Sequence, residues 1–147
     1  MSPSVPKPTR KLKEKILKPK VRVAIESNPL EYMEQEAVAQ WLDLYKVFYT
    51  ATIAGAFLHP ATFNRIKKMG LKTGVSDIII FDPPPAYDRI FIGMCLEMKR
   101  RKNGMATKEQ LGWLNKMHQR KWLTYVANGA DEAINMLEIA GYGGVKP

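Results

Sequence analysis

The chain has 147 residues, 46% of them hydrophobic, and a formal net charge of +9 at pH 7. This length suits one ordinary domain with a hydrophobic core of useful size. The single cysteine, Cys95, excludes an intramolecular disulfide. No apolar run reaches the roughly 18–20 residues that a membrane-spanning helix needs, so we expect no membrane partner.

The positive charge is concentrated at the N-terminus. Residues 1–22 hold eight Lys or Arg and one Glu, a net charge of +7, together with four prolines. Such a segment cannot form a core, so we predict a flexible basic arm over 1–26 and a single domain over 27–147. A basic arm on a nearly neutral domain points to a polyanion, with nucleic acid as the first candidate. A merely solubilising tail is the alternative interpretation.

Helical and strand patterns alternate along the domain. In chain order, we predict a helix within 27–45, capped by Asn28 with Pro29 in its first turn, a strand over 47–53, a short helix over 60–70, strands over 77–81 and 90–98, a helix over 107–120 capped by Thr107, a strand over 122–127, and a helix over 131–140 with Gly141 at its C-cap. The order α-β-(α)-β-β-α-β-α predicts a mixed α/β sheet flanked by helices.

Polar side chains interrupt the apolar strand 90–98 at its end. Glu97 and Lys99 are two residues apart, so they project from the same face of an extended chain. If strands 77–81 and 90–98 pair as a hairpin, Asp77 at the start of one lies close to Glu97 at the end of the other. Two carboxylates form a hard-oxygen site that suits Mg²⁺ or Mn²⁺. A lysine beside them could orient a water or stabilise charge on a phosphate, which fits phosphodiester hydrolysis.

Each of these residues also has a simpler interpretation. A Glu-x-Lys at a strand end is often a solvated pair, and Asp77 could be a loop residue. Gln110 can close a capping box with Thr107, although it shares a helix face with Leu114 and so borders the buried side. The charge run 99–102 is either a solvated loop or, beside a metal site, a phosphate contact. The combination favours the functional interpretation.

Two stretches together resemble a known nuclease family. "GLKTGVSDIIIF" and "CLEMKRRKNGMATKEQLGWL" resemble the virus-type replication-repair nuclease (VRR-NUC) domain, a branch of the PD-(D/E)xK superfamily. The matching residues are Gly70, Gly74, Asp77, Glu97, Lys99, Gln110, Trp113 and Leu114. The resemblance spans roughly residues 30–140 and implies a restriction-endonuclease-like mixed central sheet. Ser76 departs from it, because the family usually has proline before the aspartate.

The resemblance also implies a glutamate on the first helix. Glu31 matches the family register, with Gln35, Val38 and the Trp41–Leu42 pair at the expected spacings. The rival is Glu34, near the centre of the apolar stripe, from which Glu31 is turned by about 60°. Glu31 could also serve a capping box with Asn28. We favour Glu31.

The resemblance implies a metal-dependent, structure-specific DNA endonuclease acting as a homodimer on branched DNA such as Holliday junctions. It would work in the cytoplasm of a bacterial or virus-infected host cell. Asp77, Glu97 and Glu31 would hold Mg²⁺ or Mn²⁺, Lys99 would position the attacking water, and Gln110 would steady the site. The candidate DNA contacts are Lys11, Lys13, Lys72, Arg100, Arg101 and Lys102. The alternatives are a non-catalytic basic DNA-binding or replication-accessory module, and a nicking or restriction-like nuclease.

Overall fold

The computed structural model describes residues 30–52 and 58–144. In chain order, its elements are α2 (Glu31–Leu44), β1 (Tyr49–Ala51), α3 (Pro60–Lys68), β2 (Ile78–Ile80), the short 3₁₀ helix η1 (Pro85–Tyr87), β3 (Gly93–Lys99), α4 (Lys108–His118), β4 (Trp122–Asn128) and α5 (Ala130–Ile139). The predicted order is confirmed. The basic arm, with Lys11 and Lys13, lies outside the described residues, as do Asn28 and Pro29.

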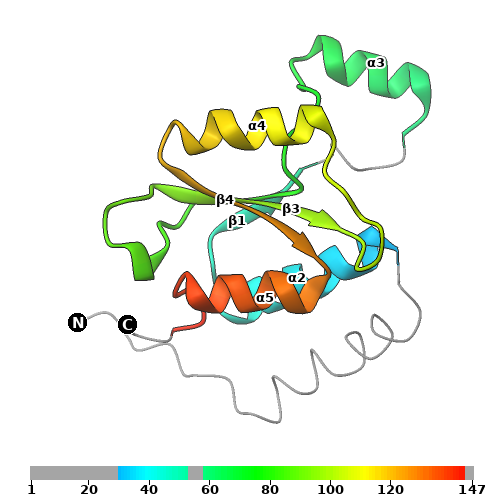
Figure 1. Ribbon diagram of the computed structural model, residues 1–147. Helices are drawn as coiled ribbons and strands as arrows, with labels where there is room; N and C mark the ends of the chain where they lie inside the picture. The colour runs from blue at the N-terminus through cyan, green and yellow to red at the C-terminus, as the bar shows by residue number, and fades with distance from the viewer. Residues whose placement is uncertain (1–29, 53–57, 145–147) are drawn as a thin grey trace.

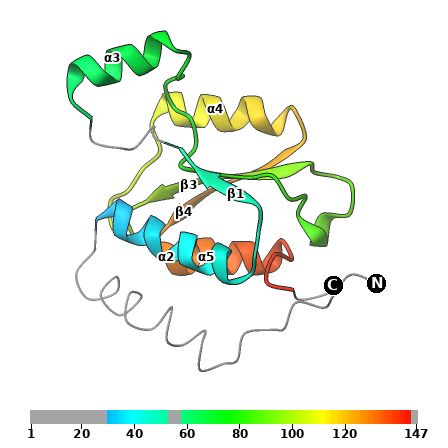
Figure 2. The same ribbon diagram turned by 180° about the vertical axis from the view of Figure 1, so that it is seen from behind.

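The four strands form one mixed sheet in the order β1-β2-β3-β4. β2 pairs antiparallel with both β1 and β3, whereas β3 and β4 run parallel. Helices α2 and α5 lie side by side on one face, α4 covers the other, and α3 projects from the body (Figures 1 and 2). The predicted mixed α/β sheet flanked by helices is therefore confirmed. Among the described residues, no helix has both the length and the apolar character needed to span a bilayer.

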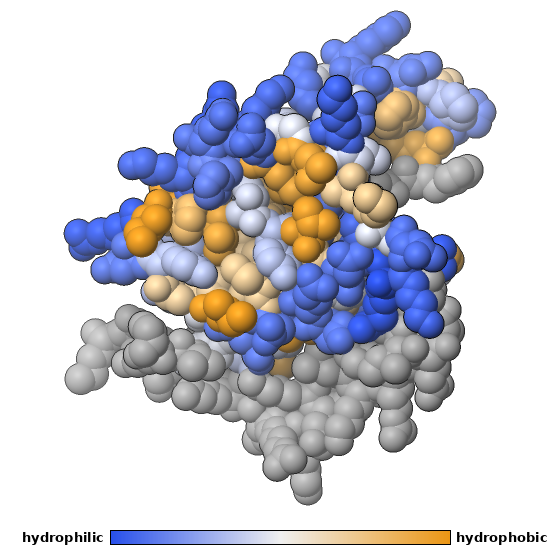
Figure 3. Space-filling view, in the orientation of Figure 1, coloured by the Kyte–Doolittle hydropathy of each residue, from blue (hydrophilic) through white to orange (hydrophobic). Residues whose placement is uncertain are grey.

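The main core lies between the sheet and the α2–α5 layer. Its members include Val38, Trp41 and Leu42 of α2, Ile134 and Leu137 of α5, and Ile78, Ile80, Met94, Leu96 and Met98 of the central strands. All seven residues of β3 are buried, as its continuous apolar sequence predicted. The surface over α3 and α4 is largely hydrophilic, and apolar patches gather below α4 on the same face (Figure 3).

The central strand β3 differs from its predicted bounds at both ends. It begins at Gly93, not at residue 90, and Ile90 and Ile92 are more than half exposed. At Gly93 an added Cβ would lie 2.5 Å from the Trp122 ring, so close packing against β4 explains the glycine at the strand start. β3 then extends through Lys99, which places both polar residues of the Glu-x-Lys pair inside the pleated strand.

One of the predicted helix caps is present, at α4, whereas α2 begins at Glu31 with Leu30 as its N-cap and not with the predicted Asn28. Thr107 caps α4, and its side chain and that of Gln110 form the reciprocal bonds of a capping box. At the end of α5 the C-cap is Ala140, and Gly141 follows it with φ +93°. The glycine therefore occupies the position after the cap, one residue later than predicted.

Candidate active site

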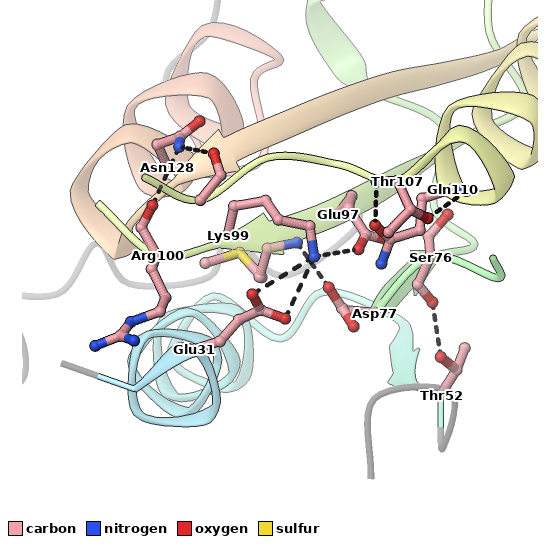
Figure 4. A network of polar contacts seen from close by, with 12 residues as sticks. Glu31, Thr52, Ser76, Asp77, Glu97, Lys99, Arg100, Thr107, Gln110 and Asn128 are labelled. Carbon is pink, nitrogen blue, oxygen red and sulfur yellow. Dashed lines mark hydrogen bonds and ion pairs between the residues drawn. The ribbon is translucent and has the colours of Figure 1, made fainter. Parts of the chain in front are cut away.

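The β2–β3 hairpin brings the predicted carboxylates together. Ile78 pairs with Leu96, so the next position in this antiparallel register sets Asp77 opposite Glu97. The Met98 amide donates a hydrogen bond to Asp77 Oδ2 at 2.7 Å. Lys99 Nζ lies 2.8 Å from Glu97 Oε1 (Figure 4). The side chains of Asp77, Glu97 and Lys99 therefore lie together in one buried region.

The glycine turn before β2 positions Asp77. Gly74 has φ +83°, and a Cβ there would lie 2.4 Å from the Glu109 carbonyl oxygen. Only glycine lets this turn pack so closely on the first turn of α4. Two hydrogen bonds from Thr52 hold the end of this turn. The Thr52 amide donates to the Asp77 carbonyl at 2.8 Å, and Thr52 Oγ1 donates to the Ser76 carbonyl at 2.7 Å. These bonds anchor the turn at the position where the related pattern has proline.

A cavity of about 190 Å³ opens at this junction. It is lined by Glu31, Thr73, Gly74, Val75, Asp77, Thr107 and Gln110. The Gln110 side-chain oxygen accepts a hydrogen bond from the Thr107 amide at 2.8 Å, so its amide nitrogen is the group left for a ligand. Gln110 therefore takes part in the cap of α4 and also lines the cavity.

Helix α2 supplies two acids with different surroundings. Glu31, with its side chain 37% exposed, has its carboxylate oxygens 3.4 and 3.5 Å from Lys99 Nζ. Glu34 is buried, accepts a hydrogen bond from the Ala130 amide at 2.7 Å, and is 3.0 Å from Arg101 Nε. The structure therefore places Glu31 at the candidate site and Glu34 in a separate ion pair.

The surroundings of the site raise the pKa values of both carboxyl groups and so favour their protonated forms. Burial, reinforced by the nearby Asp77 charge, raises the pKa of Glu97 to about 7, although Lys99 acts in the opposite direction. Burial also raises the pKa of Asp77, against the opposing effects of the Met98 amide and Lys99. The pKa of Lys99 is raised because its contacts with Glu97, Glu31 and Asp77 outweigh the effect of burial. A cation placed between the two carboxylates would relieve their repulsion.

Comparison with known proteins bears on the fold. No family model matches the sequence, and no curated protein matches it. A solved structure described as a "VRR_NUC domain protein" superposes with a TM-score of 0.59 at 22% sequence identity, covering 74% of this chain and 84% of that chain. The chain has a VRR-NUC-like fold. The prediction of a restriction-endonuclease-like mixed sheet is thereby confirmed, while at this identity the likeness bears on architecture alone.

Within this VRR-NUC-like fold, the donor set fits a hard divalent cation. Asp77 and Glu97 offer carboxylate oxygens, and beyond the Lys99 ion pair neither oxygen of Glu97 has a hydrogen-bond partner among the described residues. Among the described residues, no three or more His, Cys, Asp or Glu side chains are placed to bind one metal ion together. Mg²⁺ usually keeps several waters and binds through one or two carboxylates plus substrate phosphate, so two converging carboxylates suffice.

The basic residues predicted to contact DNA occupy different environments. Lys72, Arg100 and Lys102 are exposed. Arg101 instead turns inward, with its side chain 15% exposed and ion-paired to Glu34 and Asp131. Its guanidinium holds the loop after β3 against α2 and α5, so this charge is used inside the protein.

Sequence reasoning missed one residue that shapes the same loop. Asn128, at the end of β4, donates from Nδ2 to the Arg100 carbonyl at 3.1 Å and to the Gly104 carbonyl at 2.9 Å. Its signal was available in principle, because an amide at the end of a strand parallel to β3 lies beside the loop leaving β3. These two bonds fix the backbone of the loop that carries Arg100 (Figure 4).

Proposed function

We propose that this chain is an Mg²⁺- or Mn²⁺-dependent, structure-specific DNA endonuclease that cuts branched DNA such as Holliday junctions. The observation that carries the proposal is the meeting of Asp77 and Glu97 across the β2–β3 hairpin with Lys99 Nζ 2.8 Å from Glu97 Oε1. A buried carboxylate pair with raised pKa values costs folding stability, and such groups gather at functional sites. The VRR-NUC-like fold supports this choice over a binding-only module.

Asp77 and Glu97 would hold the ion, with Glu31 completing the site directly or through water. The bound ion would polarise the scissile phosphate and lower the pKa of an attacking water. Lys99, kept cationic by its contacts with Glu97 and Glu31, would orient that water and stabilise the negative charge that develops on the phosphate. Gln110 would donate from its amide nitrogen to a phosphate oxygen or to the water.

Lys72, Arg100 and Lys102, which are exposed, would contact the DNA backbone, with Lys11 and Lys13 of the basic arm adding further backbone contacts. We leave Arg101 out of these contacts because of its internal ion pairs. A two-fold homodimer would present two sites for paired nicks on a junction. A protein with such a substrate would act in the cytoplasm of a bacterial or virus-infected host cell.

The test is cleavage of a labelled four-way junction and a matched linear duplex, each with Mg²⁺, Mn²⁺ or EDTA. Junction cleavage should require the ion and should be lost in Lys99→Ala. The matched control is Lys46→Ala, which removes one exposed positive charge two residues beyond the C-terminal end of α2, a helix about 21 Å long that begins at Glu31.

Cleavage that persists in EDTA, or at the wild-type rate in Lys99→Ala, would overturn the mechanism. Equal cutting of the junction and the duplex would remove the preference for branched DNA and leave the nuclease. Tight junction binding without cleavage under any ion condition would instead support the binding module. Gel filtration with light scattering tests the homodimer separately.

A further inference from the structure

A second, larger cavity lies beside the candidate active site. It has a volume of about 470 Å³ and is lined by Lys72, Thr73, Glu109, Gly112, Trp113 and Lys116. Thr73 lines this cavity and the active-site cavity alike, and α4 contributes Gln110 to one and Trp113 to the other. The two cavities are therefore adjacent.

The lining combines an aromatic wall with positive charges. The Trp113 side chain is partly exposed and forms the cavity together with the bare helix surface at Gly112. Lys72 and Lys116 are exposed at the cavity, and Glu109 is the acidic member of the lining. A flat aromatic surface next to two ammonium groups is complementary to a nucleotide, which pairs a planar base with a phosphate.

Gly112 keeps the helix surface open at this cavity. It lies inside α4, where glycine is a poor helix former, yet a Cβ at this position would meet no atom within 4 Å. The fold itself therefore does not need glycine at this position. Without a side chain at this position, the α4 backbone is accessible from the cavity.

We propose that this cavity binds the base of one unpaired nucleotide in the strand being cut, stacked on Trp113, with an adjoining phosphate held by Lys72 and Lys116. The inference rests on the proposed nuclease function and deepens it. It defines the substrate as DNA with an unpaired or extruded nucleotide close to the scissile phosphate. A fully paired duplex would have to give up one base pair to bind in the same way.

The first test is a binding cycle that needs no cleavage. Fluorescence anisotropy is measured with the catalytically impaired Lys99→Ala protein and branched DNA in which an abasic site is moved one nucleotide at a time through the unpaired region. At one position, loss of the base should weaken binding about 5- to 150-fold, the range for one stacked base. In Lys99→Ala carrying Trp113→Ala, the same abasic site should cause no further loss, because coupled contacts are not additive.

Gly112→Leu is a second test variant, chosen because it should block the cavity without unfolding the protein. Leucine is a better helix former than glycine, and a Cβ at this position meets no atom within 4 Å, so the variant should melt no lower than its parent. It should nevertheless block the cavity and weaken binding as much as the abasic site does. Gly112→Ala is the matched control that improves the helix while leaving most of the cavity open. Lys116→Gln should reduce the slope of log affinity against log salt by about 0.7–0.9, as for one lost phosphate contact.

A flat abasic scan, or wild-type affinity in Gly112→Leu, would overturn the proposal. So would a free deoxynucleoside monophosphate that binds the cavity while the abasic scan stays flat, because the site would then take free nucleotide and not the strand. Wild-type protein that cuts branched DNA without coupling between Trp113 and the base would refute this inference and keep the nuclease. Coupling without any cleavage would keep the cavity and refute the nuclease.

Discussion

The buried Glu97 carboxylate should make the metal-free protein less stable as the pH rises. Its pKa is raised to about 7 in the folded state from an ordinary value of 4.5. A carboxyl with a raised folded-state pKa binds its proton more tightly in the folded than in the unfolded protein. Its ionisation therefore removes stability as the pH rises from about 4.5 through 7. At about 1.4 kcal/mol per pKa unit, the loss between pH 5 and pH 8 is on the order of 2–3 kcal/mol.

Other groups with shifted pKa values do not cancel this slope. The pKa of Asp77 is also raised, so its ionisation acts in the same direction. Lys99 has a raised pKa above its ordinary 10.5, and stability from this lysine is lost only above that pH. Asp131, whose pKa is lowered mainly by Arg101 against the effect of burial, contributes stability that is lost only in acid below about pH 4.

The assay is urea unfolding in EDTA at pH 5, 6.5 and 8, repeated with Glu97→Gln. The wild-type free energy of unfolding should fall across this range, and most of the slope should disappear in the variant. Mg²⁺ or Mn²⁺ should stabilise the wild type more at pH 8 than at pH 5, because the ion competes with protons for the same oxygens. A wild-type protein in EDTA that is as stable at pH 8 as at pH 5, or a variant with an unchanged slope, would refute this account.

Four further substitutions separate effects on cleavage from effects on stability. Lys99→Ala should lower the single-turnover cleavage rate by a factor of about 10²–10⁴ while junction affinity changes much less. Glu31→Ala should reduce cleavage with little change in melting temperature, since this carboxylate is partly exposed. Glu34→Ala should instead lower the free energy of unfolding by about 2–3 kcal/mol, because it deprives the Arg101 guanidinium of a buried partner. Arg101→Ala should cost about 3 kcal/mol for the converse reason, measured by urea unfolding. A stable, inactive Glu34→Ala beside an active Glu31→Ala would reverse this assignment.

The parts of the fold that sequence predicted well depend on local patterns. The continuous apolar strands around a turn-rich connection predicted the β2–β3 hairpin, and antiparallel geometry then required Asp77 to meet Glu97. The Thr107–Gln110 box was also readable, because its two bonds span only three residues. The start of β3 was not readable, because residues 90–92 are apolar but do not pair as strand.

The basic run after β3 shows where sequence reasoning ends. Arg100 and Arg101 are neighbours with the same charge, yet one is exposed and the other is ion-paired in the interior. What separates them is the position of Glu34 and Asp131, which lie 67 and 30 residues away along the chain. The Trp113 cavity has the same origin, since it requires the turn at Thr73 to pack beside α4. Neither arrangement follows from composition or periodicity.

The places of Glu31 and Glu34 in the structure explain why the helical periodicity could not separate them. The two acids are three residues apart on α2, so they lie on nearly the same helix face. Each glutamate forms an ion pair with a basic side chain at or just after the end of β3. Glu31 pairs with Lys99, and Glu34 pairs with Arg101. The buried Glu34–Arg101 pair, in which Glu34 also accepts a hydrogen bond from the Ala130 amide, fixes how α2 lies against the end of β3. The same alignment then holds the Glu31–Lys99 pair at the carboxylate site. We therefore expect Glu34→Gln, which keeps the Ala130 hydrogen bond, to disturb cleavage less than Glu34→Ala, because it preserves more of that alignment.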